Sequence, residues 1–168
     1  MDKKPRLVVV LDIDDTLLLT LQVLLVAYRQ IAREVLGLPE RSKEEWFHAW
    51  PRPFREIIET VYPELSSLEI DNACNILREG VKDLDIPAVP GAVEAVQRMR
   101  EVAMIVCLIT SRVSNLIRRL EKAKFKMNWF KVVVDGTYNY PKPDRRAFDP
   151  IFKLDKGRGN SCQNLLYQ

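Results

Sequence analysis

Two aspartates follow directly on a short apolar segment near the N-terminus. Residues 7–11 are all aliphatic, and Asp12 and Asp14 come immediately after them. In extended backbone, a two-residue spacing points two side chains to the same side. Two neighbouring carboxylates either repel each other or share a cation, and Mg²⁺ prefers such oxygen ligands. The pair predicts a metal site, while the alternative is that both residues serve as ordinary turn and helix-cap residues.

The elements around this pair predict an α/β fold. An apolar, β-branched run such as 7–11 is typical of a strand buried on both faces in a parallel sheet, where ligands bind beyond the carboxyl ends of the strands. Further strands are predicted at 102–109 and 132–134, with the opening of a fourth at 164–167. Helices are predicted at 91–101, 114–123 and 149–156. Alternating strands and helices indicate a Rossmann-like parallel sheet with flanking helices.

Between the first predicted strand and the rest lies a long helical block without one convincing strand. The spacing of apolar residues predicts a helix over 17–35, and Ser42 with Glu45 forms a capping signature for a second helix through Trp50. Two more helices are predicted at 54–62 and 67–84. The apolar face of the first is expected to comprise Leu17, Leu21, Leu24, Tyr28, Ile31 and Val35. The predicted domains are therefore an α/β core, 1–16 with 88–168, and a helical insertion, 17–87.

Composition excludes several function classes. The 168 residues are 47% hydrophobic and carry a net charge of only +3, which is too weak to favour nucleic acid as a main partner. The longest apolar stretch, 17–27, is too short to cross a bilayer. No membrane partner is therefore expected. Three cysteines without metal-ligand spacing indicate a reduced, cytoplasmic protein. The oligomeric state stays open.

Three motifs, in order, resemble those of the haloacid dehalogenase-like (HAD) superfamily of phosphotransferases. Asp12-Ile13-Asp14-Asp15-Thr16 matches the first motif, Thr110 ends the next strand as the second does, and Lys142-Pro143 matches the third. The chain is most similar to the phosphatase branch with an α-helical cap inserted after the first strand, such as phosphoglycolate phosphatases. The resemblance covers nearly the whole chain and implies that 17–87 is the cap.

The resemblance also implies roles for these residues. Asp12 is expected to attack phosphorus and form an aspartyl-phosphate, and Asp14 to act as general acid and then as base. Mg²⁺ would be held by the Asp12 carboxylate and the Asp14 main-chain carbonyl, while Thr110 and Lys142 bind the phosphate. The implied activity is Mg²⁺-dependent hydrolysis of a small phosphorylated metabolite, because the family's dehalogenases lack an acidic residue at the position of Asp14.

Further substrate contacts are predicted beside these motifs and in the cap. Thr16, Ser111 and Arg112 follow the first two strands, close to the expected phosphate site. Arg52 and Arg55 are candidates in the cap for meeting an anionic substrate, although solvated surface arginines are the commoner interpretation. His48, the only histidine, is more often a partly buried or surface residue than a substrate contact.

The chain departs from the family at its C-terminus. The fourth motif, acidic residues after a further strand, would follow Tyr167, and the sequence given ends at Gln168. Neither Asp135 nor Asp155 is expected to replace it. Mg²⁺ binding is therefore expected to be weak, and the sheet incomplete, in what is either a fragment or a naturally truncated protein. The alternative function is a non-catalytic relative that binds a phosphorylated ligand or a protein partner.

Overall fold

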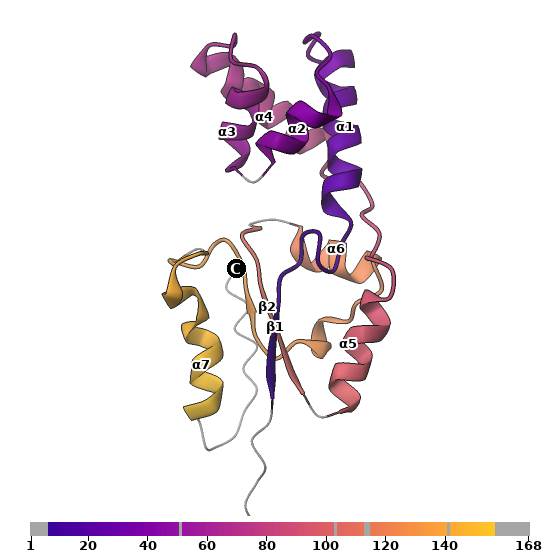
Figure 1. Ribbon diagram of the computed structural model, residues 1–168, viewed down its shortest axis with the longest axis vertical. Coiled ribbons are helices and arrows are strands. Elements are labelled where there is room, and N and C mark those ends of the chain that lie inside the picture. Colours follow the sequence, from indigo (N-terminus) through magenta and orange to yellow (C-terminus); the bar gives the residue numbers. More distant parts are fainter. Residues whose placement is uncertain (1–6, 51, 103, 113–114, 141, 157–168) are drawn as a thin grey trace, which may run out of the picture. The chain divides into compact units, whose positions relative to one another are not determined.

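A computed structural model describes residues 7–156 except 51, 103, 113–114 and 141 (Figure 1). Three parallel strands form one sheet in the order β1-β2-β3, namely β1 (Val8–Leu11), β2 (Ile105–Ile109) and β3 (Val133–Val134). Seven α-helices occur in the described residues, so the predicted α/β, Rossmann-like class is confirmed. The predicted strand at 164–167 and the third cysteine, Cys162, lie outside the described residues.

The strands are short aliphatic runs whose register brings their carboxyl ends to one edge. Leu11 pairs with Leu108, and Leu108 pairs in turn with Val133. The second strand begins at Ile105 and not at the predicted position 102. The reason is that the backbone N–H of Val102 still bonds to the carbonyl of Arg98 and that of Met104 to Met99, so these residues close the preceding helix.

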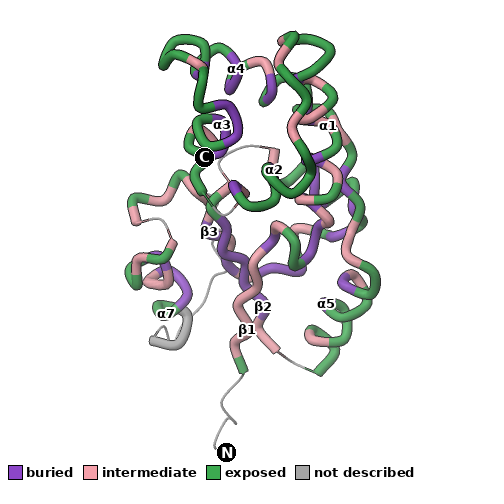
Figure 2. The backbone as a smooth tube through the Cα atoms, turned by 45° about the horizontal axis from the view of Figure 1, so that its top comes forward, coloured by how far each residue is buried: buried purple, intermediate pink, exposed green. Residues whose placement is uncertain are grey.

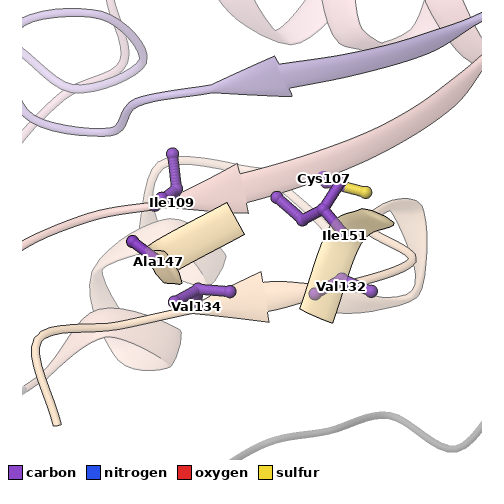
Figure 3. Packing of buried hydrophobic residues seen from close by; sticks show 6 residues of the cluster. All are labelled: Cys107, Ile109, Val132, Val134, Ala147 and Ile151. Carbon is purple, nitrogen blue, oxygen red and sulfur yellow. The ribbon is translucent and has the colours of Figure 1, made fainter. Parts of the chain in front are cut away.

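Helices lie on both faces of the sheet (Figure 1). Helix α7 (Asp149–Lys156) follows η2 (Arg145–Phe148) and packs on one face, while α5 (Ala92–Glu101) and α6 (Leu116–Lys122) lie on the other. The α7 face is an apolar cluster of Cys107, Ile109, Val132, Val134, Ala147 and Ile151 (Figure 3). Because side chains alternate along a strand, Val106 and Leu108 point to the opposite face. β2 is therefore buried along most of its length, whereas β1 is only partly buried (Figure 2).

Contacts divide the chain into two compact units, which we call the sheet unit and the helical unit. The helical unit is Thr20–Leu84, and the sheet unit comprises the described residues of 1–19 and 85–168. Four helices build the helical unit, α1 (Thr20–Glu34), α2 (Lys43–Ala49), α3 (Phe54–Val61) and α4 (Ser67–Gly80). Its core contains an aromatic cluster in which Trp46, fully buried, contacts the rings of Tyr28 and Tyr62.

The first helix begins at Thr20, so the prediction that it starts at residue 17 is wrong. The carbonyl of Ile13 accepts hydrogen bonds from the N–H groups of Leu17 and Leu18, which closes a tight turn in place of a helix. The residues buried on α1 are Thr20, Leu24, Leu25, Tyr28 and Ala32. Val35, predicted to lie on the buried face, follows the helix and is 65% exposed.

Two short segments of the sheet unit run side by side where the chain enters and leaves the helical unit. Leu18 and Ala88 form an antiparallel bridge. The N–H of Leu19 donates to the carbonyl of Pro87 over 3.0 Å, and that of Val89 to Leu17 over 2.8 Å. Residues 17–19, predicted to open the first helix, are therefore not helical, because they pair with residues 87–89.

Two further observations bear on the sequence predictions. No helix among the described residues is both long and apolar enough to cross a membrane.

Cys74 and Cys107 are buried free thiols, and burial raises the pKa of each. Neither is in a position to act as a thiolate nucleophile at neutral pH.

Candidate active site

The site begins where β1 ends. Asp12 is the first residue after the strand, and its Oδ1 accepts a hydrogen bond of 2.8 Å from the backbone N–H of Ile13. The chain then reverses in a tight turn, in which Asp15 adopts a left-handed backbone conformation (φ 59°) and donates its N–H to the carbonyl of Leu18. Asp is among the few non-glycine residues that accept this conformation at low cost. The turn places Asp14 beside the end of the strand.

Lys142 lies against Asp12. Its Nζ is 2.8 Å from Asp12 Oδ1, with side chains that are 25% and 44% exposed respectively. The same oxygen thus carries both the hydrogen bond and the ion pair. Within the described residues, the other carboxylate oxygen of Asp12 has no hydrogen-bond or ion-pair partner. Asp12 is therefore oriented through one oxygen, and the second is available for chemistry.

Arg112 forms the second ion pair of the site. Its Nη2 donates to Oδ1 of Asp14, and the arginine side chain is only 14% exposed. The backbone of Arg112 is fixed on both sides, because its N–H donates to Oγ1 of Thr110 over 3.1 Å and its carbonyl accepts from Gly136. Thr110 is itself 3% exposed and donates its N–H to Val134 of β3. The ends of β1, β2 and β3 are thus linked through one arginine.

The structure places the remaining sequence candidates as follows. Thr16 and Ser111 are exposed; Thr16 lies within the turn after β1, and Ser111 is the second residue after β2. Arg52 and Arg55 belong to the helical unit and have partners there: Arg52 donates to the carbonyl of His48, and Arg55 to Glu59 and to Ser67. Their predicted roles in substrate binding stay predictions.

The loop that carries Lys142 is held by its own contacts. The guanidinium of Arg146 lies 3.9 Å from the ring centre of Tyr140, and Tyr140 contacts Tyr138 edge-on. Arg146 also donates to both carboxylate oxygens of Asp144, and this side-chain hydrogen bonding lowers the pKa of Asp144. The Lys142–Pro143 peptide bond is cis.

The donor set fits a magnesium ion bound with few protein ligands. No group of three or more histidine, cysteine, aspartate or glutamate side chains able to hold a metal occurs among the residues that the structure describes. Mg²⁺, however, is commonly bound through one or two carboxylates, with water and substrate phosphate completing its shell. The Asp12 carboxylate, with one uncommitted oxygen, and the main chain of Asp14 would be such a set.

Asp135 does not join this set. It follows β3 at the same edge, but its Oδ1 accepts from the backbone N–H and the hydroxyl of Thr137 and so caps its own loop. That Asp135 is no substitute for a further metal ligand stays a prediction. The pairing of Arg112 with Asp14 was not predicted; the only signal for it is that both residues follow neighbouring strands of a parallel sheet.

The sequence profile of the haloacid dehalogenase-like hydrolase family matches residues 9–157. The chain belongs to this family. No curated protein matches it by sequence, so the family assignment rests on the profile. The matched range contains the three motifs that carry Asp12, Thr110 and Lys142.

Solved structures of HAD hydrolases share the fold. A predicted phosphoglycolate phosphatase from Haemophilus somnus superposes with a TM-score of 0.70 at 15% identity, covering 89% of this chain and 70% of that one. A HAD hydrolase of subfamily IA from Geobacter sulfurreducens gives 0.67 at 20% identity, covering 89% and 72%. The magnesium-bound candidate HAD hydrolase YfnB from Bacillus subtilis gives 0.69 at 16% identity, covering 94% and 75%. At these identities the similarity establishes the HAD fold.

Proposed function

We propose that this HAD-family hydrolase is a Mg²⁺-dependent phosphatase that hydrolyses a small phosphomonoester through an aspartyl-phosphate. The single observation that carries the proposal is the contact of Lys142 with Asp12. A lysine on the candidate nucleophile supplies a positive charge where an anionic carboxylate must meet an anionic phosphate. Its second oxygen, uncommitted within the described residues, gives Asp12 an atom with which to attack.

The proposed reaction has two steps. Asp12 attacks phosphorus, the bond from phosphorus to the ester oxygen breaks, and Asp14 in its protonated form gives its proton to the leaving oxygen. Asp14, now a carboxylate, then takes a proton from a water molecule that attacks the aspartyl-phosphate. This second step releases orthophosphate and restores both aspartates. Thr110 and Lys142 are proposed to bind phosphate oxygens, with Ser111, Thr16 and Arg112 as proposed further contacts.

The magnesium ion would be held by the Asp12 carboxylate and the main chain of Asp14. When bound, it offsets the negative charge of the phosphate that approaches the nucleophile. Asp12, Asp14 and Lys142 perform the remaining tasks of orienting the nucleophile, moving the proton and holding the phosphate.

Hydrolysis of p-nitrophenyl phosphate by the 168-residue chain in the presence of Mg²⁺ tests the proposal. Asp12→Asn removes the nucleophile, so turnover is expected to fall by at least about 1000-fold. Asp85→Asn makes the same change at a surface carboxylate paired with Lys122, and is expected to keep wild-type turnover. Equal rates for Asp12→Asn and wild type would contradict the proposed mechanism.

The second candidate is a non-catalytic HAD relative that binds a phosphorylated ligand or a protein partner. It is favoured by the lack of a three-residue metal-binding group in the described part of the chain. The two candidates differ in one measurement. Mg²⁺-dependent turnover by the same chain excludes the non-catalytic function, whereas orthophosphate binding without turnover supports it.

The substrate is proposed only as a class. A helical unit inserted after the first strand, which we propose to be the cap, would choose the leaving group and exclude water. Arg52 and Arg55 are its candidates for contacting an anionic group. The cytoplasmic location and the lack of a nucleic-acid partner also stay predictions, and the oligomeric state stays open.

A further inference from the structure

The two candidate catalytic carboxylates each have their own basic partner. Lys142 pairs with Asp12 and Arg112 with Asp14, so each acid has a side chain of opposite charge beside it. The pairs differ in their exposure to water. Asp12 is 44% exposed and its lysine 25%, whereas Arg112 is only 14% exposed. Water screens the Arg112 charge less, so this charge acts more strongly on its neighbours.

Arg112 cannot withdraw from the site by a simple loop movement. Its N–H is bonded to Thr110, and its carbonyl accepts from Gly136 in the loop after β3. Both anchors lie at the ends of sheet strands. Any change of partner by Arg112 therefore has to come from its side chain.

The guanidinium also has donor capacity left over. Its Nε is buried, and within the described residues it has no hydrogen-bond acceptor. An arginine offers five N–H donors in a planar fork, and a buried donor without an acceptor costs free energy. A phosphate oxygen is the kind of acceptor that removes this cost, and it matches the fork geometry of arginine.

We propose that Arg112 is an internal counter-ion that couples metal binding to phosphate binding. Without phosphate it occupies Asp14 and disfavours a divalent cation beside the two aspartates. When phosphate enters, Arg112 shares its donors with the phosphate oxygens, and the cation binds more tightly. Besides contacting the substrate, Arg112 would thus keep the affinity for the cation low until a phosphate is bound. This inference rests on the proposed phosphate site, but it does not require turnover.

The coupling has a signature that a purely structural role lacks. Removal of the Arg112 charge strengthens cation binding and weakens phosphate binding, whereas a general loss of folding weakens both. By thermodynamic linkage, phosphate and the cation must raise each other's affinity by the same factor in the wild type. This factor is expected to shrink towards one when Arg112 is replaced.

Titrations of the whole 168-residue chain with Mn²⁺, followed by water-proton relaxation, test the coupling. They are run with and without orthophosphate on wild type, Arg112→Met, Arg112→Lys and, as a matched control, Arg98→Met on the exposed surface of α5. In Arg112→Met the dissociation constant for Mn²⁺ without phosphate is expected to fall, and that for orthophosphate to rise, each at least about threefold. Arg112→Lys is expected to keep the wild-type Mn²⁺ affinity, and Arg98→Met to match wild type in both.

Each other outcome has a defined meaning. Unchanged or weaker Mn²⁺ binding in Arg112→Met overturns the counter-ion role, and so does unchanged or tighter orthophosphate binding in that variant. Wild-type protein that binds neither Mn²⁺ nor orthophosphate overturns the phosphate site itself, and the coupling with it. Binding with the expected signature but without p-nitrophenyl phosphate turnover overturns only the catalytic proposal.

Discussion

At the scale of single residues, Asp12 is oriented before any substrate arrives. Its Oδ1 accepts a hydrogen bond from the backbone N–H of Ile13 and forms an ion pair with Lys142, each over 2.8 Å. A hydrogen bond and an ion pair on one oxygen restrict rotation of the carboxylate. A fixed carboxylate with one oxygen left for attack is the arrangement that favours nucleophilic catalysis, because less orientational freedom is lost in the reaction.

Replacing Lys142 separates this role from folding. We expect Lys142→Met to lower kcat/KM for p-nitrophenyl phosphate by about 100-fold, because a charge facing the phosphate is lost. Lys142→Arg is expected to restore part of this loss. The ion pair is partly exposed and contributes at most about 1 kcal/mol to stability, so thermal unfolding of Lys142→Met should stay close to that of wild type. Lys153→Met, on the exposed surface of α7, is the control, and a similar loss in it would refute the assignment.

The sequence indicated some of these residues and missed one contact. Asp12 and Thr110 could be found because each ends an aliphatic run, and parallel strands bring such ends to one edge. The ion pair of Arg112 with Asp14 joins residues 98 positions apart. It depends on the turn between Ile13 and Leu18, which has no distinct sequence signal. Sequence spacing predicts which residues meet at a sheet edge, but not which side chains pair there.

At the scale of elements, two helices of the helical unit begin with the same reciprocal cap. Ser42 Oγ accepts from the N–H of Glu45 while Glu45 accepts from the N–H of Ser42, and Ser66 and Glu69 repeat this arrangement at α4. The backbone N–H of Ser42 lowers the pKa of Glu45, and the hydroxyl of Ser66 that of Glu69. Because both caps are exposed, their contribution to helix stability depends on the pH of the solvent.

These caps predict how the stability of the helical unit depends on pH. A carboxylate whose pKa is lowered in the folded state stabilises the folded protein at pH values above its ordinary pKa of 4.5. This contribution is lost as the pH falls through the lower pKa of the folded state. We therefore expect the free energy of unfolding to fall less on acidification below pH 4.5 in Glu69→Gln than in wild type. Urea unfolding followed by circular dichroism at a series of pH values measures this.

Glu56→Gln provides the matched comparison. Glu56 is an exposed glutamate in the first turn of α3, and its side chain makes no hydrogen bond among the described residues. The free energy of unfolding of Glu56→Gln is expected to change with pH as that of wild type does. Profiles of Glu69→Gln and wild type that run parallel through the acid range would show that the cap contributes nothing to pH-dependent stability.

Element boundaries show why the first helix was placed too early. Leu17 and Leu21 have the spacing of a helical face, and periodicity cannot distinguish that from a turn followed by a helix. The turn forms because Ile13 accepts the N–H groups of Leu17 and Leu18, and because Leu19 pairs with Pro87 far along the chain. The caps of α2 and α4, by contrast, are local, and the Ser42–Glu45 cap was predicted from the residues alone.

At the scale of the whole molecule, contacts divide the chain into two compact units. Ile58 of α3 and Leu108 of β2 are each fully buried, one in each unit. Truncation of either to alanine is expected to cost about 2–5 kcal/mol through lost contacts and a residual cavity. Because contacts cluster within each unit, we expect each loss to fall first on the unit that carries the substitution.

Hydrogen–deuterium exchange with mass spectrometry measures where each loss falls. In Ile58→Ala, exchange is expected to rise in peptides within residues 20–84 while β2 keeps its protection, because local stability reflects local packing. Leu108→Ala is expected to show the reverse pattern. A uniform rise across both units in either variant would show that they unfold as one cooperative body.

The hydrogen-bonded neighbours Leu19 and Pro87 have a consequence for how such a chain can change. The chain leaves the sheet unit and returns to it at two hydrogen-bonded neighbours, so the length of the segment between them has little effect on the strands. The entropy of closing a loop grows only slowly with the number of residues in it. We therefore expect that helices between these two residues can be exchanged, lengthened or removed while Asp12 and Asp14 keep their positions at the end of β1.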